Sequence, residues 1–144
     1  MQSWGYHLLI NARRCAPATI RSKPTIESFS RTLVKNIDMV PYGTPQVIMF
    51  GSGNKKGYTL VQLIETSNIT GHFVEETDDM YLDVFSCKDF KPETVEDMVQ
   101  SYFRPESVDS RMIVRDASRK MMDIQTGSGR GHPTMAKYKA RTMK

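Results

Sequence analysis

Four short apolar runs follow one another between residues 46 and 86, and only short turns separate them. They cover residues 46–50, 58–66, 68–73 and 80–86 and are rich in β-branched and aromatic side chains. Runs of this length, bounded by glycine-rich or acidic turns, are typical of β-strands. Strands joined by tight turns pair antiparallel, because a parallel pair needs a crossover of roughly a dozen residues. This stretch therefore predicts an antiparallel sheet.

Two segments with helical spacing flank these strands. The first begins after Thr25, a residue type favoured at a helix N-cap, and the second begins at Pro92, a favourable first-turn residue, and ends before Pro105. Each carries apolar residues along a single face. In the first helix these residues are Ile26, Phe29, Leu33 and Ile37.

Further strands are expected at residues 4–10 and 111–115, which gives the order strand, helix, four strands, helix, strand. Two helices that are each apolar on one face need a common surface to bury that face. The expected fold is therefore α+β: a two-layer sandwich of an antiparallel sheet with two helices on one face. A chain of 144 residues is long enough for one such core.

The net charge of +4 is unevenly distributed along the chain. Residues 117–144 contain seven Lys or Arg and one acidic residue, for a net +6, whereas residues 1–116 carry −2. Apolar periodicity also fades after residue 116, and residues 127–131 have the glycine-rich composition of a flexible linker. We expect one domain at residues 1–116 and a basic, flexible C-terminal tail at 117–144. Because no base-reading element accompanies the basic residues, a nucleic-acid partner is disfavoured.

Several common sites are excluded by spacing. The glycine-rich turn at residues 51–57 is not followed by the Gly-Lys-Ser/Thr and helix of a phosphate-binding loop, so it is read as a hairpin loop. His7, His72 and His132 are too scattered to predict a metal site.

No apolar run approaches the ~18 residues of a membrane-spanning helix, and residues 1–10 lack the features of a signal peptide. No membrane association is expected. Cys15 and Cys87 fit free thiols in a reducing compartment, so we expect a cytoplasmic protein.

Candidate reactive residues gather near two of the predicted strands. Ser67 and His72 lie in a polar stretch of one run, and Cys87 ends another. Serine, histidine and cysteine near one another permit nucleophilic attack and proton transfer. On residue chemistry alone, the alternative that these are three ordinary strand residues is favoured.

The motifs around these residues resemble those of the bacterial S-adenosylmethionine decarboxylase family over residues 4–116. The resemblance implies a two-layer sandwich, commonly dimeric, with active sites near the subunit interface. The matching motifs are Gly-Tyr-His-Leu at 5–8, Cys15, Gly-Tyr-Thr at 57–59, Thr-Ser-Asn-Ile-Thr-Gly-His at 66–72 and Leu-Asp-Val-Phe-Ser-Cys at 82–87.

The family resemblance implies a role for each reactive residue. Ser67 attacks the carbonyl of Thr66, the chain is cut between these two residues, and Ser67 becomes a pyruvoyl group, the cofactor. His72 assists this cleavage. Cys87 donates a proton after the substrate loses carbon dioxide. Gly71 is a candidate for the backbone bend that cleavage needs.

Four positions depart from the family pattern. Thr66 and Asn68 replace the family's glutamate and histidine on either side of the serine, and Asn11 and Phe73 replace an acidic residue and a threonine. Cleavage between Glu65 and Thr66 is disfavoured, because a shift of one residue turns the nucleophile to the opposite face of the strand. The changes predict altered substrate recognition near the reacting amine.

The sequence thus predicts a self-processing carboxy-lyase for S-adenosylmethionine, in spermidine and polyamine synthesis. Alternatives are a pyruvoyl-dependent arginine or ornithine decarboxylase of the same family, or a non-processing paralogue that acts as a dimer partner. Its partners are a small-molecule substrate and a second copy in a homodimer or higher homo-oligomer. Aromatic side chains suit an adenine ring and a sulfonium cation. Trp4, Phe50, Phe73 and Tyr81 are the candidates.

Overall fold

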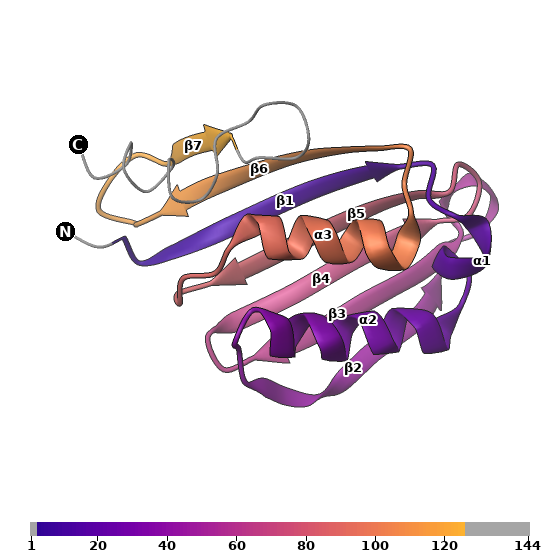
Figure 1. Ribbon diagram of the computed structural model, residues 1–144, viewed down its shortest axis with the longest axis horizontal. Coiled ribbons are helices and arrows are strands. Elements are labelled where there is room, and N and C mark those ends of the chain that lie inside the picture. Colours follow the sequence, from indigo (N-terminus) through magenta and orange to yellow (C-terminus); the bar gives the residue numbers. More distant parts are fainter. Residues whose placement is uncertain (1–2, 126–144) are drawn as a thin grey trace.

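The computed structural model describes residues 3–125, and within them a seven-stranded antiparallel sheet carries the fold. The strands are β1 (Gly5–Arg13), β2 (Pro41–Phe50), β3 (Gly57–Ile64), β4 (Ser67–Val74), β5 (Asp79–Ser86), β6 (Ser107–Arg115) and β7 (Met122–Gln125). Their spatial order is β2-β3-β4-β5-β1-β6-β7. The first strand is thus inserted between β5 and β6, which confirms the antiparallel α+β sandwich (Figure 1).

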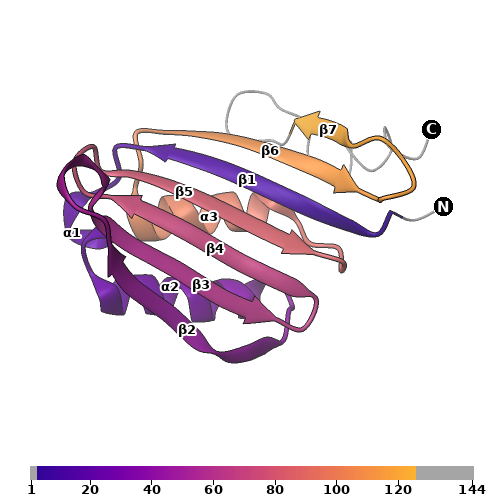
Figure 2. The ribbon, with the colours of Figure 1, turned by 180° about the vertical axis from the view of Figure 1, so that it is seen from behind.

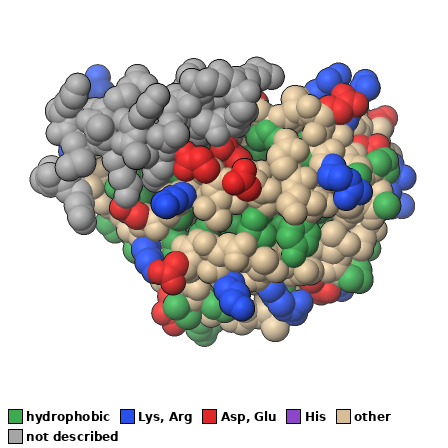
Figure 3. Space-filling model, viewed as in Figure 1, with side chains coloured by type: hydrophobic (Ala, Val, Ile, Leu, Met, Phe, Trp, Pro, Cys, Tyr) green, Lys and Arg blue, Asp and Glu red, His purple; other side chains and the backbone are tan. Residues whose placement is uncertain are grey.

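Two long helices, α2 (Lys23–Asn36) and α3 (Pro92–Phe103), cover one face of this sheet, and the short α1 (Pro17–Ile20) lies at its end (Figure 1). In the view from behind, no helix among residues 3–125 covers the other face of the strands (Figure 2). We call this uncovered side the open face. On the helix-bearing side, acidic and basic side chains are interspersed (Figure 3).

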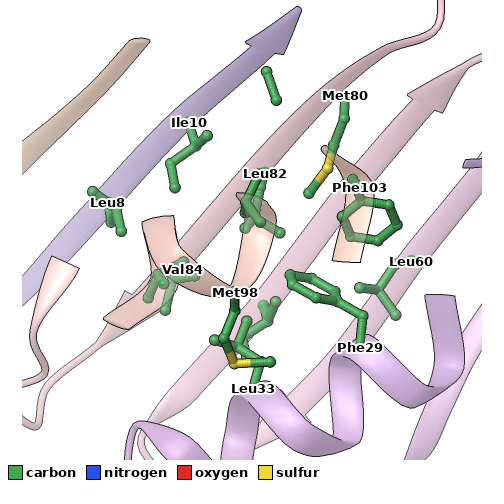
Figure 4. Close-up of a cluster of buried hydrophobic side chains, with 14 of the residues drawn as sticks. Leu8, Ile10, Phe29, Leu33, Leu60, Met80, Leu82, Val84, Met98 and Phe103 are labelled. Atoms are coloured by element: carbon green, nitrogen blue, oxygen red, sulfur yellow. The ribbon is translucent and has the colours of Figure 1, made fainter. Parts of the chain in front are cut away.

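The core lies between α2, α3 and the sheet. Phe29 of α2 packs edge-on against Phe103 of α3 with ring centroids 4.9 Å apart, and Phe103 in turn packs against Phe73 of β4. The Phe29 and Phe103 rings of the helices pack against inward-pointing strand residues such as Leu60 of β3 and Leu82 of β5 (Figure 4). Burial of these large side chains fixes which face of each strand points inward, and therefore which residues the open face presents.

Two local features of the helices differ from the sequence prediction. The cap of α2 is Ser22 instead of Thr25, and its hydroxyl accepts the Thr25 N–H. The helix can begin earlier because Pro24, in its first turn, has no N–H to satisfy. Helix α1 was not predicted, since four residues are too few to display a period.

Strand β7 was also not predicted. It lies within residues 117–144, which were assigned to a flexible tail, yet it pairs with β6 through Met112 opposite Ile124. Residues 126–144, the remainder of the segment that was expected to be flexible, lie outside the described residues.

The β2–β3 connection is the hairpin loop that the sequence predicts, with a single 3-10 turn at Gly53–Lys55. Gly57 after this loop lies so close to β4 that an added Cβ would stand 1.5 Å from the Phe73 carbonyl oxygen. The glycines here serve a turn and a close strand contact.

Candidate functional site

The turn between β3 and β4 holds the residues that the sequence analysis singled out for cleavage. Strand β3 ends at Ile64 and β4 starts at Ser67, so Glu65 and Thr66 form a two-residue connection. Ser67 lies opposite Ile64 on one side and Ser86 on the other. Its φ angle is +157°, at the edge of the range that non-glycine residues rarely adopt. Gly71, by contrast, lies in regular pairing within the strand and has no positive φ.

The carbonyl group of Thr66 is hydrogen-bonded. The backbone N–H of Cys87 donates to the Thr66 oxygen at 3.0 Å. A donor at this oxygen draws electron density from the carbonyl carbon and stabilises negative charge that develops on the oxygen during attack. The peptide bond between Thr66 and Ser67 is therefore polarised in the direction that a nucleophile needs.

Two buried residues, Ser86 and Met39, hold the Thr66 side chain in place. The fully buried Ser86 hydroxyl donates to Thr66 Oγ1 at 2.8 Å, and the Met39 sulfur lies 3.3 Å from the same oxygen. Ser86 Oγ also accepts the Lys88 N–H at 2.9 Å. These contacts hold the turn and the residues after β5 in one arrangement. In the sequence, Ser86 stands out only as part of a motif, and only its place next to Cys87 hinted at this role.

Cys87 and Cys15 occupy opposite ends of the sheet, because they follow the ends of the antiparallel neighbours β5 and β1. Cys87 is exposed, whereas Cys15 is buried, and both are free. Burial, with the nearby Asp79 and Asp78, raises the pKa of the Cys15 thiol to about 12. Cys87 is thus the cysteine available for chemistry.

His72 lies at the other end of β4 from Ser67. Its Nδ1 is 3.2 Å from the hydroxyl of Thr59 on β3, its direct neighbour across the strands. His72 is five positions after Ser67 along the strand, a span of ~16 Å at about 3.3 Å per residue. No side chain bridges this distance, so one chain places the Cys87 N–H on the Thr66 carbonyl, beside Ser67, but leaves His72 apart.

A second group of side chains flanks the site on the open face. His7 Nε2 lies 3.0 Å from Asp83 Oδ1, and the His7 ring packs against Phe85 with centroids 5.4 Å apart. Phe85 also contacts Trp4, at 5.6 Å between centroids. Asp83 and Phe85 were not predicted as site residues. Their alternate spacing with Cys87 was the signal that could have placed all three on one face.

The aromatic candidates divide by exposure. Trp4, Phe50 and Tyr81 are 55%, 54% and 42% exposed, whereas Phe73 is 1% exposed and packs in the core. Phe73 is therefore unsuitable for stacking on a substrate and contributes to core packing instead. Asn11 lies opposite Tyr81, which is itself opposite His72, so it too is remote from the turn.

Among residues 3–125, no group of three or more His, Cys, Asp or Glu side chains is arranged to hold a metal ion. No helix in this described part is long and apolar enough to cross a membrane.

Comparison with known proteins gives both a family match and a structural match. The sequence profile of the family described as S-adenosylmethionine decarboxylase matches residues 6–116. The crystal structure of the adenosylmethionine decarboxylase from Aquifex aeolicus VF5 superposes with a TM-score of 0.68 at 21% identity, over 81% of this chain and 93% of that chain. A search of curated proteins gave no match.

The two thiols should react differently with an alkylating reagent. At neutral pH we expect Cys87 to be modified in the native protein while Cys15 is protected, because Cys15 is 3% exposed and its pKa is raised to about 12. Peptide mass spectrometry locates the label, and Cys87→Ala should abolish native labelling. Rapid labelling of Cys15 without denaturant would contradict the environment described here.

Proposed function

The chain belongs to the S-adenosylmethionine decarboxylase family, and we propose that it cuts itself between Thr66 and Ser67 to become a pyruvoyl-dependent decarboxylase of S-adenosylmethionine. Members of this family are carboxy-lyases. The observation that carries the proposal is the hydrogen bond from the Cys87 N–H to the Thr66 carbonyl, 3.0 Å long, at a strained turn. The product would supply aminopropyl groups for spermidine.

The first step is intramolecular. The Ser67 hydroxyl attacks the Thr66 carbonyl carbon, and the Cys87 N–H stabilises the charge on the oxygen. The C–N bond then breaks, and the acyl group of Thr66 passes to the Ser67 oxygen as an ester. Loss of the α-proton of Ser67 expels the Thr66 carboxylate, and water releases ammonia from the remaining dehydroalanine. The balance is one water consumed and one ammonia formed.

The residues at the turn fit a pyruvoyl group. The carbon atoms of such a group come from Ser67, and the strands on either side of Ser67 already hold its backbone in place. Ser86 and Met39 fix Thr66 on the other side of the bond to be cut. When present, such a group supplies an electron sink for the bond that breaks as carbon dioxide leaves. Cys87 would then donate its Sγ proton to the substrate's α-carbon.

The ~16 Å span between Ser67 and His72 leads to a proposal about the assembly. Several large apolar side chains on the open face are solvent-exposed in one chain, so a partner packed on this face would remove apolar surface from water. They include Ile48, Phe50, Leu63 and Tyr81, at 48%, 54%, 46% and 42% exposure. Two chains could bury these residues by packing their open faces together as a homodimer.

A dimer of this kind could also complete the site. Suppose that the two-fold axis lies between the two facing sheets and runs perpendicular to the strands. The β4 strand of the partner then runs in the opposite direction to β4 of the first chain. The His72 end of β4 in the partner subunit would then lie over the backbone of the Thr66–Ser67 turn, because Ser67 itself shares with Ile69 and Phe73 the face of β4 that points toward the helices. The Thr59–His72 pair, 3.2 Å apart, would serve the cleavage of the neighbouring chain.

A second candidate substrate is a basic amino acid, arginine or ornithine. It is favoured by Thr66, whose hydroxyl is held by Ser86 where the family resemblance implies a carboxylate. Release of carbon dioxide from each carboxyl-labelled substrate, measured on one preparation of processed enzyme, separates the candidates. Two free cysteines are consistent with a cytoplasmic enzyme.

Substitutions at Ser67 and Cys87 should separate cleavage from decarboxylation. Ser67→Ala removes the nucleophile, so we expect neither cleavage nor carbon dioxide release. Cys87→Ala keeps the backbone N–H that contacts Thr66, so cleavage should continue while turnover falls by roughly 100-fold or more. Denaturing gels and carbon dioxide release measure the two activities, and equal loss of cleavage in both variants would contradict the division of roles.

Mixed dimers test whether His72 acts on its own chain. A His72→Ala chain should cleave poorly alone but should be cut when co-expressed with a Ser67→Ala chain that carries an intact His72. Different affinity tags identify the two chains on a gel. Thr59→Val, placed in the Ser67→Ala chain, should weaken this rescue. Failure of rescue in confirmed mixed dimers would mean that His72 acts in its own chain or has no role in cleavage.

A further inference from the structure

Three connections of the chain meet at the end of the sheet where the cleavage is proposed. They are the β3–β4 turn with Glu65 and Thr66, the start of the β5–α3 connection at Cys87, and the turn between α2 and β2 at residues 37–40. All three lie at the same end of the sheet (Figure 1). The first two carry the peptide bond to be cut and its N–H donor. The α2–β2 turn carries no reacting group, yet it contacts both.

The end of α2 fixes the α2–β2 turn in place. The Met39 N–H donates to the Val34 carbonyl at 2.9 Å, and the Asp38 N–H donates to the Lys35 carbonyl at 3.1 Å. This is the hydrogen-bond pattern of a Schellman helix end. Asp38 occupies its left-handed position, with a φ angle of +58°. Glycine is the usual residue there, because it has no Cβ. The aspartate provides a carboxylate for a contact that glycine cannot make.

The α2–β2 turn holds the acyl side of the bond to be cut. The Val40 carbonyl accepts the Glu65 N–H at 2.9 Å. The Met39 sulfur lies 3.3 Å from Thr66 Oγ1. Glu65 and Thr66 directly precede the bond to Ser67, so one backbone contact and one side-chain contact locate the carbonyl group that the proposed attack needs.

The same turn holds the N–H donor, Cys87, through the residues on both sides of it. Before Cys87, the Ser86 hydroxyl lies 3.6 Å from the Met39 sulfur. After Cys87, the Lys88 ammonium lies 3.0 Å from the Asp38 carboxylate and also donates to the Asp38 carbonyl oxygen. The backbone at Cys87 is therefore anchored to the α2–β2 turn at two points, and an ion pair makes the second.

Loss of this ion pair should affect the reaction more than the fold. The side chains of Asp38 and Lys88 are 95% and 46% exposed, and exposed pairs contribute little to stability. We propose that Asp38 and Lys88 are a positioning pair, whose attraction holds the Cys87 N–H against the Thr66 carbonyl while negative charge develops on that oxygen. The proposal rests on the proposed self-cleavage and adds to it two residues outside the turn that is cut.

The rate of self-cleavage of the full chain tests this proposal. The chain is labelled in a short pulse of cell-free translation, and denaturing gels follow the loss of its uncleaved form. We expect Lys88→Met to cleave roughly fivefold more slowly than the parent. Asp38→Asn should fall between the two, because asparagine suits the left-handed backbone and the carbonyl oxygen at this position still accepts the Lys88 ammonium. Melting temperatures, compared in Ser67→Ala chains so that none is cut, should agree within about 2 °C.

Salt, a conservative variant and a matched control separate positioning from folding. Sodium chloride at ~1 M screens an exposed ion pair, so it should slow the parent toward the Lys88→Met rate and leave the Lys88→Met rate nearly unchanged. Lys88→Arg keeps the charge and should cleave at close to the parental rate. The matched control is Asp78→Asn, which should also cleave at that rate. Asp78 has a φ angle of +59° and pairs with Arg21 at 3.0 Å, but it lies in the β4–β5 turn at the other end of the sheet.

The two proposals fail in distinguishable ways. If the parent cleaves and Lys88→Met cleaves at the same rate, self-cleavage stands and the positioning pair is wrong. The positioning pair is also wrong if Lys88→Met cleaves slowly but melts many degrees lower, or if Asp78→Asn is slowed as much, because the loss would then come from folding or from general charge. If the parent never cleaves, the self-cleavage proposal is wrong and the positioning pair is overturned with it.

Discussion

The pairing of β4 with β5 is the constraint on which the site depends. In this register Ser67 lies opposite Ser86, so the residue after β5 delivers its N–H to the Thr66 carbonyl. A slip of one residue would turn every side chain of β4 to the other face and remove this contact. The register is fixed by burial, since Ile69, Phe73 and Leu82 must all point toward α2 and α3. The packing of the core thus positions a backbone donor against one peptide bond.

One-sided coverage of the sheet has a second consequence. Helices bury only the inner side of the strands, so the open face keeps both its apolar residues and its reactive groups exposed. Cys87 and His72 are therefore accessible, but they lie at different ends of the sheet. A second chain packed on the open face would bury the apolar residues and could also bring the missing histidine. Stability and catalysis would then depend on the same interface.

Much of the fold could be predicted from sequence because local patterns were strong. Short runs rich in β-branched and aromatic residues identified β4 and β5, the helical spacing of Ile26, Phe29 and Leu33 identified α2, and tight turns implied antiparallel pairing. Strand β7 was missed, since four residues among basic and small ones show no clear alternation. Its pairing with β6 is a tertiary effect, visible only when the neighbouring strand is in place.

The residues of the site could be predicted from motif spacing, but their arrangement in space could not. Spacing within motifs identified Ser67, His72 and Cys87, but distance along a sequence does not measure distance in a sheet. His72 seemed a neighbour of Ser67 at five residues, yet an extended strand separates them by ~16 Å. Conversely, Cys87 is twenty residues from Ser67 in the chain but adjacent across the strands. The buried Ser86, which holds Thr66, gave no chemical signal of its own in the sequence.

The central claim is that Ser67 becomes the head of a new chain. Mass spectrometry of the purified, denatured protein tests it most directly. The account predicts two fragments, residues 1–66 with a free carboxylate and residues 67–144 with a blocked N-terminus. The larger should be lighter by one ammonia than the same fragment beginning with serine, and it should react with hydroxylamine as a ketone does. A single uncleaved chain after prolonged incubation, or a larger fragment with a free serine amine, would contradict the account.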